Sequence, residues 1–115
     1  MKRLKDARNI PTTVKAGYQH YDIRVYGEVG GLNNRNIGAV THRDHLISLD
    51  GTVILGDGAE TLLHELIHIA WDSGKLDDVV GHDAEEKIVG VLSQRMATMI
   101  HDNPDLFKWI IKNVG

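Results

Sequence analysis

The chain has no cysteine among its 115 residues. A disulfide framework and a thiolate metal site are therefore both excluded, and any metal ion has to be held by histidine and carboxylate side chains. No apolar run approaches the roughly eighteen residues that a membrane-spanning helix needs, and no charged-then-apolar leader precedes a small-residue cleavage site. These absences fit a cytoplasmic protein, and we expect neither a membrane anchor nor a targeting segment.

An excess of charge of one sign is also missing. The formal net charge is −3 and the pI is about 6.1. The basic residues are scattered apart from the start of the chain, so nothing indicates a nucleic-acid or membrane surface. Internal repeats, low-complexity tracts and linkers are absent as well. We expect residues 1–115 to form one domain with a single modest core, in which residues 1–9 are a frayed, solvated tail.

One stretch holds a cluster whose spacing matches a specific chemistry, Glu60 to Asp72, with the sequence ETLLHELIHIAWD. His64 and His68 are four residues apart, so on a helix they project from one face, where two imidazoles can reach one metal ion. Glu65 lies between them, and apolar residues surround all three. The pattern HExxH is the zincin signature, in which the glutamate acts on a metal-bound water. The alternative is a core helix with two hydrogen-bonded histidines and no metal.

The ends of this helix are predicted from its flanks. Asp57 and Glu60, three residues apart, predict a capping box that starts the helix at Gly58 or Ala59. Gly74 offers a stop at the other end, which gives a helix of about fifteen residues. An acidic residue in the last turn, Asp72, is expected at the surface, although it could also orient a ligand imidazole.

The remaining elements predict an α+β fold with a small antiparallel sheet of two hairpins packed on the motif helix. The first hairpin joins the TTVKA run to residues 18–26 around Gly17, with Tyr21, Ile23 and Val25 on its buried face. Residues 27–36 are expected to form a loop. The second hairpin joins residues 37–40 to residues 45–49. A second long helix follows Asp83, and a short third helix starts at Pro104 with Asn103 as its cap. The predicted docking face of the third helix consists of Leu106, Trp109, Ile110 and Val114.

A catalytic zinc ion usually has three protein ligands and one open position. The metzincin pattern needs a third histidine six residues after His68, but that position is Gly74, so the metzincin class is excluded. His82 lies in an aspartate-rich connector beside a glycine, which is a poor way to fix a ligand. Glu85 and Glu86, at the start of the second helix, are better candidates.

Helical periodicity alone does not decide whether Glu85 or Glu86 is the third ligand. Glu86 begins a stripe of small side chains, Gly90, Ser93 and Ala97, along which another helix could approach closely. Glu85 begins an apolar stripe, where a buried carboxylate would also need a cation. The non-ligand alternatives are a second capping box for Glu86 and a favourable first-turn charge for Glu85. Both remain open at this point, with Glu86 preferred.

These segments resemble the gluzincin peptidases, and among them the small phage and prophage proteins related to the ImmA/IrrE metallopeptidases. The resemblance is carried by the segments IPTTVKAGYQHYDIRVYG, HLISLD, TLLHELIHIAW and EEKIVGVLSQRM, and by a DNP break before the terminal helix. In such enzymes the third ligand is a glutamate followed at i+4 and i+7 by small or polar residues, which matches Glu86 with Gly90 and Ser93. The resemblance implies a minimal zincin-like domain.

The activity that the resemblance implies is zinc-dependent hydrolysis of peptide bonds. Zn²⁺ would be held by His64, His68 and Glu86, with Glu85 as the alternate third ligand. Glu65 would act as the general base, taking a proton from water and passing it to the leaving amine. The expected substrate is a protein or peptide, such as a phage or host regulator, cleaved in the host cytoplasm if the chain is phage-encoded.

Two further roles are also left open by the sequence. The resemblance makes His45 to Asp50 an edge strand that pairs with an extended substrate. The candidates for a second donor to the oxyanion are Tyr26, His42, His45 and His101. The competing functions are a zincin-fold protein that binds metal and acts by protein–protein contact without cleaving, and a metal-stabilised virion component. Glu65 favours the peptidase, because a purely structural site needs ligands but no base.

Overall fold

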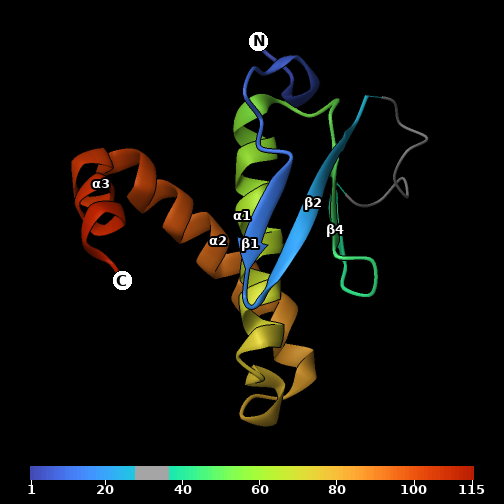
Figure 1. The fold of residues 1–115 in the computed structure, drawn as a ribbon, viewed down its shortest axis with the longest axis vertical. Helices are drawn as coiled ribbons and strands as arrows, with labels where there is room; N and C mark the ends of the chain where they lie inside the picture. The colour runs from blue at the N-terminus through green and yellow to red at the C-terminus, as the bar shows by residue number, and fades with distance from the viewer. Residues whose placement is uncertain (28–36) are drawn as a thin grey trace.

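The computed structural model describes residues 1–27 and 37–115, in which a four-stranded sheet packs against a long helix (Figure 1). The strands are β1 (Thr13–Ala16), β2 (Gln19–Tyr26), β3 (Gly38–Thr41) and β4 (Leu46–Asp50). The helices are α1 (Leu55–Ser73), α2 (Glu85–Asp102) and α3 (Pro104–Asn113), with short 3-10 turns η1 (Leu4–Asp6), η2 (Leu76–Asp78) and η3 (His82–Ala84). The predicted α+β class is confirmed. The predicted loop lies, apart from Gly27, outside the described residues.

The first predicted hairpin is confirmed. β1 and β2 pair antiparallel, and Gly17 makes the turn with a φ of +62°, a conformation that favours glycine. A Cβ at Gly17 would also lie 2.9 Å from the side chain of Ser73. Along β2, Tyr21 and Ile23 are buried while the residues between them are exposed, so the period of two places one face of the hairpin on the core.

The order of the strands differs from the prediction, because β4 lies inside the sheet between β2 and β3. It runs parallel to β2 and antiparallel to β3, so the sheet is mixed and the predicted antiparallel sheet is wrong. The prediction that His45 to Asp50 form an edge strand is wrong as well. Ile47 and Leu49 of β4 are fully buried, which favours the interior of the sheet for this strand. Among the described residues, the edge strand next to β4 is β3.

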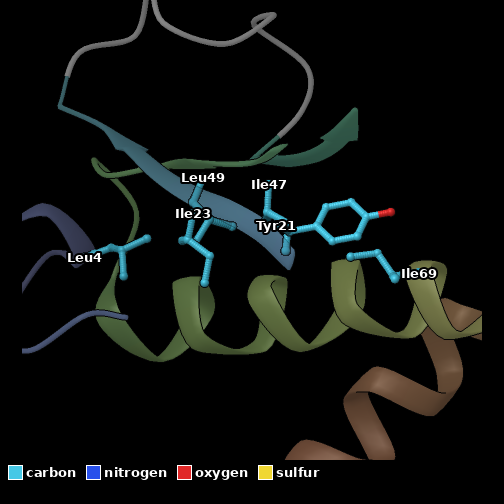
Figure 2. Packing of buried hydrophobic residues seen from close by; sticks show 6 residues of the cluster. All are labelled: Leu4, Tyr21, Ile23, Ile47, Leu49 and Ile69. Atoms are coloured by element: carbon cyan, nitrogen blue, oxygen red, sulfur yellow. The ribbon is translucent and has the colours of Figure 1, made fainter. Parts of the chain in front are cut away.

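The core lies between the sheet and α1. Figure 2 shows its six buried side chains, Leu4, Tyr21, Ile23, Ile47, Leu49 and Ile69. Leu62 and Leu66 of α1 pack against this cluster. Two residues further along a helix correspond to a rotation of about 200°, so His64 and His68 project from the opposite face of α1, away from this core. Packing of the apolar face thereby fixes the direction in which the two imidazoles point.

The N-terminal residues are ordered against the rest of the chain, which contradicts the prediction of a frayed tail. Leu4 is buried, and its backbone N–H donates to the Val53 carbonyl at 2.9 Å. The N–H of Lys5 donates to the Gly51 carbonyl, also at 2.9 Å. A Cβ added to Gly58 would lie 2.8 Å from Leu4, so this glycine makes room for the leucine. One apolar residue in a basic segment was too weak a pattern to predict this docking.

α1 begins earlier than predicted, at Leu55, and its N-cap Ile54 makes no side-chain capping bond. The predicted capping box is therefore absent, and Asp57 lies inside the first turn. The N–H of Leu55 donates to the Lys2 carbonyl at 3.0 Å, so the docked N-terminus supplies a partner that a capping side chain would otherwise provide. The C-terminal end agrees with the prediction, since α1 ends at Ser73 with Gly74 as its C-cap.

α2 packs against α1, whereas α3 projects away from the sheet and has no buried residue (Figure 1). The predicted docking face of α3 is exposed, and Trp109 on that face is 64% exposed. Pro104 is the first helical residue, as predicted. Asn103 is the N-cap residue of α3, as predicted, but its side chain makes no capping bond, and its Nδ2 donates to the Met99 carbonyl at the end of α2. No helix in the described parts of the chain is both long and apolar enough to cross a membrane.

Candidate metal centre

Three potential ligand side chains converge between α1 and the start of α2. The Nε2 atoms of His64 and His68 are 3.1 Å apart. Glu86 reaches both of them, with one carboxylate oxygen 3.1 Å from His64 Nε2 and the other 3.0 Å from His68 Nε2. The structure therefore brings together the two motif histidines and the glutamate that the sequence favoured as third ligand.

The other nitrogen of each ring has a hydrogen-bond partner of its own. His68 Nδ1 lies 2.7 Å from a carboxylate oxygen of Glu85, which can only accept, so this nitrogen carries the proton. His64 Nδ1 lies 3.3 Å from Ser93 Oγ, whose hydroxyl donates to the Gly90 carbonyl at 3.1 Å. The serine oxygen therefore accepts a hydrogen bond from His64. With the ring proton on Nδ1, each imidazole has its Nε2 lone pair available to a cation.

The donor atoms that converge here can be compared with those of a metal site. In that tautomer, two imidazole lone pairs and a carboxylate lie within about 3 Å of one another, an arrangement that a positive charge among them would stabilise. The edges of a tetrahedral zinc site with bonds of 2.0 to 2.1 Å are about 3.3 Å long, close to the separations seen here. The donor set of two imidazoles and one carboxylate also suits zinc. The residues present fit such an ion.

Glu85 and Glu86 both reach the site but at different atoms. Glu86 faces the two Nε2 atoms and its side chain is 76% exposed, whereas the side chain of Glu85 is 18% exposed and holds His68 from behind. The sequence indicated Glu85 as an alternate ligand or as a favourable first-turn charge and did not reveal this supporting role. Neither glutamate acts as an N-terminal cap, since Ala84 is the N-cap of α2 and no side chain bonds to it.

Two of the small residues after Glu86, Gly90 and Ser93, line a cavity. A Cβ added to Gly90 would meet nothing within 4 Å, so α1 does not approach α2 closely at this position. Ser93 is buried and reaches His64, as described above. The spacing of seven residues between Glu86 and Ser93 was the sequence signal for this contact, because it places both on one face of α2.

Glu65 lies in the wall of the cavity beside the convergent donors. The residue is 7% exposed, and its side chain packs against Gly38 of β3, where an added Cβ would lie 3.3 Å from a carboxylate oxygen. Burial raises the pKa of the Glu65 carboxyl above its usual value. The charge of Glu86 adds to this rise, while the nearby histidines oppose it. A carboxyl with a raised pKa is a stronger proton acceptor than one in water.

The cavity itself has a volume of about 620 Å³. One wall is the exposed edge strand, through residues 37–40, and the opposite walls are the histidine face of α1 and the first turns of α2. His42, from the turn between β3 and β4, closes one side. The cavity therefore joins a strand that, among the described residues, lies at the edge of the sheet to the convergent donors and to Glu65.

His42 is the member of the four oxyanion-donor candidates that lines this cavity. Its Nδ1 lies 3.2 Å from the hydroxyl of Tyr21 and 3.9 Å from a carboxylate oxygen of Asp72. Asp72, predicted at the surface, is 69% exposed there and does not contact a motif imidazole. The other candidates lie elsewhere, since Tyr26 pairs with Asp50 in the sheet, His45 packs on the ring of Tyr21, and His101 is exposed near the end of α2.

Comparisons of the chain with protein-family models, with curated proteins and with solved structures found no significant match.

Proposed function

We propose that the chain is a small zinc-dependent peptidase with a zincin-like site, related to the ImmA/IrrE metallopeptidases that its sequence resembles. The observation that carries the proposal is the convergence of His64 Nε2, His68 Nε2 and the Glu86 carboxylate beside a buried Glu65. A site that only stabilised the fold would need the three ligands but would gain nothing from a buried carboxylate that costs free energy to ionise.

In this proposal His64, His68 and Glu86 hold the zinc ion, and Glu85 and Ser93 fix the two imidazole rings. When bound, the ion would polarise the scissile carbonyl group and lower the pKa of an attacking water. Glu65 would accept a proton from that water and deliver it to the leaving amine nitrogen. Its raised pKa and its position against the edge strand support this role.

His42 is proposed as the second donor to the developing oxyanion. Burial, with the nearby charge of Asp72, raises the pKa of the Tyr21 phenol, so the hydroxyl stays protonated. When the protonated Tyr21 hydroxyl donates its hydrogen bond to His42 Nδ1, the imidazole carries its own proton on Nε2. That N–H can donate to a carbonyl oxygen in the cavity that His42 lines.

The substrate is proposed to bind in extended form along β3. Within the described residues, β3 pairs with β4 on one side and has no strand on the other. An added peptide strand would use the free backbone N–H and C=O groups of this edge. Because β3 forms a wall of the cavity that Glu65 and the histidines share, such a peptide would run past the site of hydrolysis. Phage or host regulatory proteins are the substrate class that we propose.

The proposal is tested by incubating zinc-loaded protein with unstructured β-casein and with a bacterial lysate. We expect defined fragments from the wild-type chain, none after chelation, and none from Glu65→Gln. Asp57→Asn is the matched control, because it also neutralises a carboxylate on α1 but is exposed and outside the cavity. Its fragments should equal those of the wild type. The same fragments from Glu65→Gln would end the peptidase proposal.

The alternative function is a metal-binding protein that acts by protein contact without cleavage. The exposed apolar residues of α3 favour this alternative, because monomeric proteins rarely expose a large apolar patch. Among them are Leu106, Trp109 and Ile111. Zinc binding with no cleavage by the wild-type chain would favour this alternative over the peptidase.

A further inference from the structure

We propose that Asp77, His82 and Glu85 form a second divalent-cation site, coupled to the first through Glu85. The three residues come from three successive elements, η2, η3 and the first position of α2. His82 Nδ1 lies 3.3 Å from one carboxylate oxygen of Asp77 and 3.8 Å from one of Glu85. One ligand atom from each residue lies within 4.8 Å of the others. These separations can close around one ion with small side-chain rotations.

Each carboxylate is held so that one oxygen is occupied and the other faces His82. The indole N–H of buried Trp71 donates to Asp77 Oδ1 at 2.7 Å, which leaves Oδ2 towards the imidazole. Glu85 uses Oε2 for the hydrogen bond to His68 and presents Oε1 to His82. The sequence disfavoured His82 as a metal ligand, because the connector that holds it was expected to be flexible. The structure instead places it in a 3-10 turn between two anchored carboxylates.

The local charge also favours a cation. Between Asp72 and Glu86 the sequence has six carboxylates and a single lysine, Lys75. In the described part of the chain, no lysine or arginine forms an ion pair with any member of the cluster. A divalent ion bound among these carboxylates would offset part of this negative charge. One imidazole with two carboxylates suits zinc.

The second site should bind more weakly than the first. The side chain of His82 is 81% exposed and that of Asp77 is 48% exposed, whereas that of His68 is 16% exposed. Exposed ligands are more mobile and are better solvated when the ion is absent, so more free energy is lost on binding. The two sites are therefore expected to fill one after the other as zinc is raised.

Because both sites share Glu85, we expect zinc binding at one site to lower the zinc affinity of the other. This consequence rests on the metal centre proposed above. A cation on Oε1 draws electron density from the carboxylate and weakens the hydrogen bond that Oε2 accepts from His68. His68 Nε2 then becomes a poorer donor to the first ion. Linkage requires the effect to be reciprocal, so each ion lowers the affinity of the other by the same factor.

The experiment is a zinc titration of the metal-free chain, followed by equilibrium dialysis and by tryptophan fluorescence. Trp109→Phe, at an exposed position, leaves Trp71 as the single tryptophan that reports. We expect two zinc ions per chain, with a change in Trp71 emission as the weaker ion binds next to its hydrogen-bond partner. His82→Ala should reduce binding to one ion and abolish the weak-phase emission change.

The control is His101→Ala, since His101 is also exposed and also lies beside a carboxylate, Asp102, at 3.2 Å. It should bind two ions. Asp77→Asn keeps an acceptor for Trp71 while removing the charge, and it should weaken the second ion at least about tenfold. One zinc ion per wild-type chain, or an unchanged weak phase in His82→Ala, would overturn the second site.

The same titration separates this proposal from the peptidase. Glu86→Gln should lose the tight ion and keep the weak one with its emission change, whether or not the wild-type chain cleaves peptides. Loss of both ions in Glu86→Gln would mean that the cluster at His82 is no independent site.

Discussion

At the scale of single residues, Glu85 and Glu86 are adjacent in sequence but are expected to differ in their effect on zinc affinity. Glu86→Ala removes the carboxylate that faces both Nε2 atoms and is the proposed third zinc ligand, whereas Glu85→Ala removes the acceptor behind His68. A lost supporting hydrogen bond typically costs about 10-fold to 100-fold in metal affinity, and a lost ligand costs more. Competition with a chromophoric chelator measures both. An equal loss in the two variants would contradict the roles assigned here.

Gly38 and Gly90 provide a second prediction at this scale, because the same added methyl group should have opposite effects. A Cβ at Gly38 would lie 2.4 Å from Thr61 Cγ2, so Gly38→Ala should destabilise the fold by about 1 to 3 kcal/mol. A Cβ at Gly90 meets nothing, and alanine is the better helix former, so Gly90→Ala should stabilise by about 0.5 to 1 kcal/mol. Urea unfolding measures both. Destabilisation by Gly90→Ala would show that α2 needs the space.

At the scale of elements, the two ends of the chain should contribute very differently to stability. Leu4 is buried against Gly58, so Leu4→Ala should cost about 2 to 4 kcal/mol. Leu106 on α3 is 54% exposed, and Leu106→Ala should change stability by less than about 0.5 kcal/mol. Equilibrium denaturation compares the two variants. A larger loss at Leu106 would mean that α3 docks where the sequence first suggested.

The elements also show what the sequence could predict and what it could not. Local patterns were sufficient where the information is local: Gly17 for the first turn, the period of two along β2, and the four-residue spacing of His64 and His68. The place of β4 inside the sheet depends on which strand pairs with β2, and hairpin signals alone do not specify that pairing. The contact between Tyr21 and His42 joins separate elements and has no sequence signal that could have revealed it.

In the candidate site, too, local features could be predicted from the sequence and contacts between separate elements could not. The histidine pair and Glu65 could be predicted from one helix, because α-helical geometry fixes their relative positions. The assignment of Glu86 to the Nε2 atoms and of Glu85 to Nδ1 depends on the rotation of α2 about its axis. That rotation is set by the burial of Val89 and Ser93 against the rest of the protein. Two neighbouring glutamates could therefore be predicted as a pair but not separated.

At the scale of the whole molecule, zinc is expected to act as a cross-link between α1 and α2. Only Val89 and Ser93 of α2 are buried, so this helix has little apolar anchorage of its own. Zinc at about 1,000 times its dissociation constant should add about 4 kcal/mol to the free energy of unfolding. Calorimetric unfolding with and without zinc measures the gain. Glu65→Gln should show the full gain and Glu86→Gln should lose most of it, and an equal gain in both would contradict the ligand assignment.

Every part of the proposed function depends on where the tight zinc ion binds, and anomalous diffraction at the zinc absorption edge from crystals of the zinc-loaded chain locates it directly. The account predicts a strong peak about 2.0 to 2.2 Å from His64 Nε2, His68 Nε2 and a carboxylate oxygen of Glu86. No peak among these three atoms, or a strong peak only elsewhere, would contradict it.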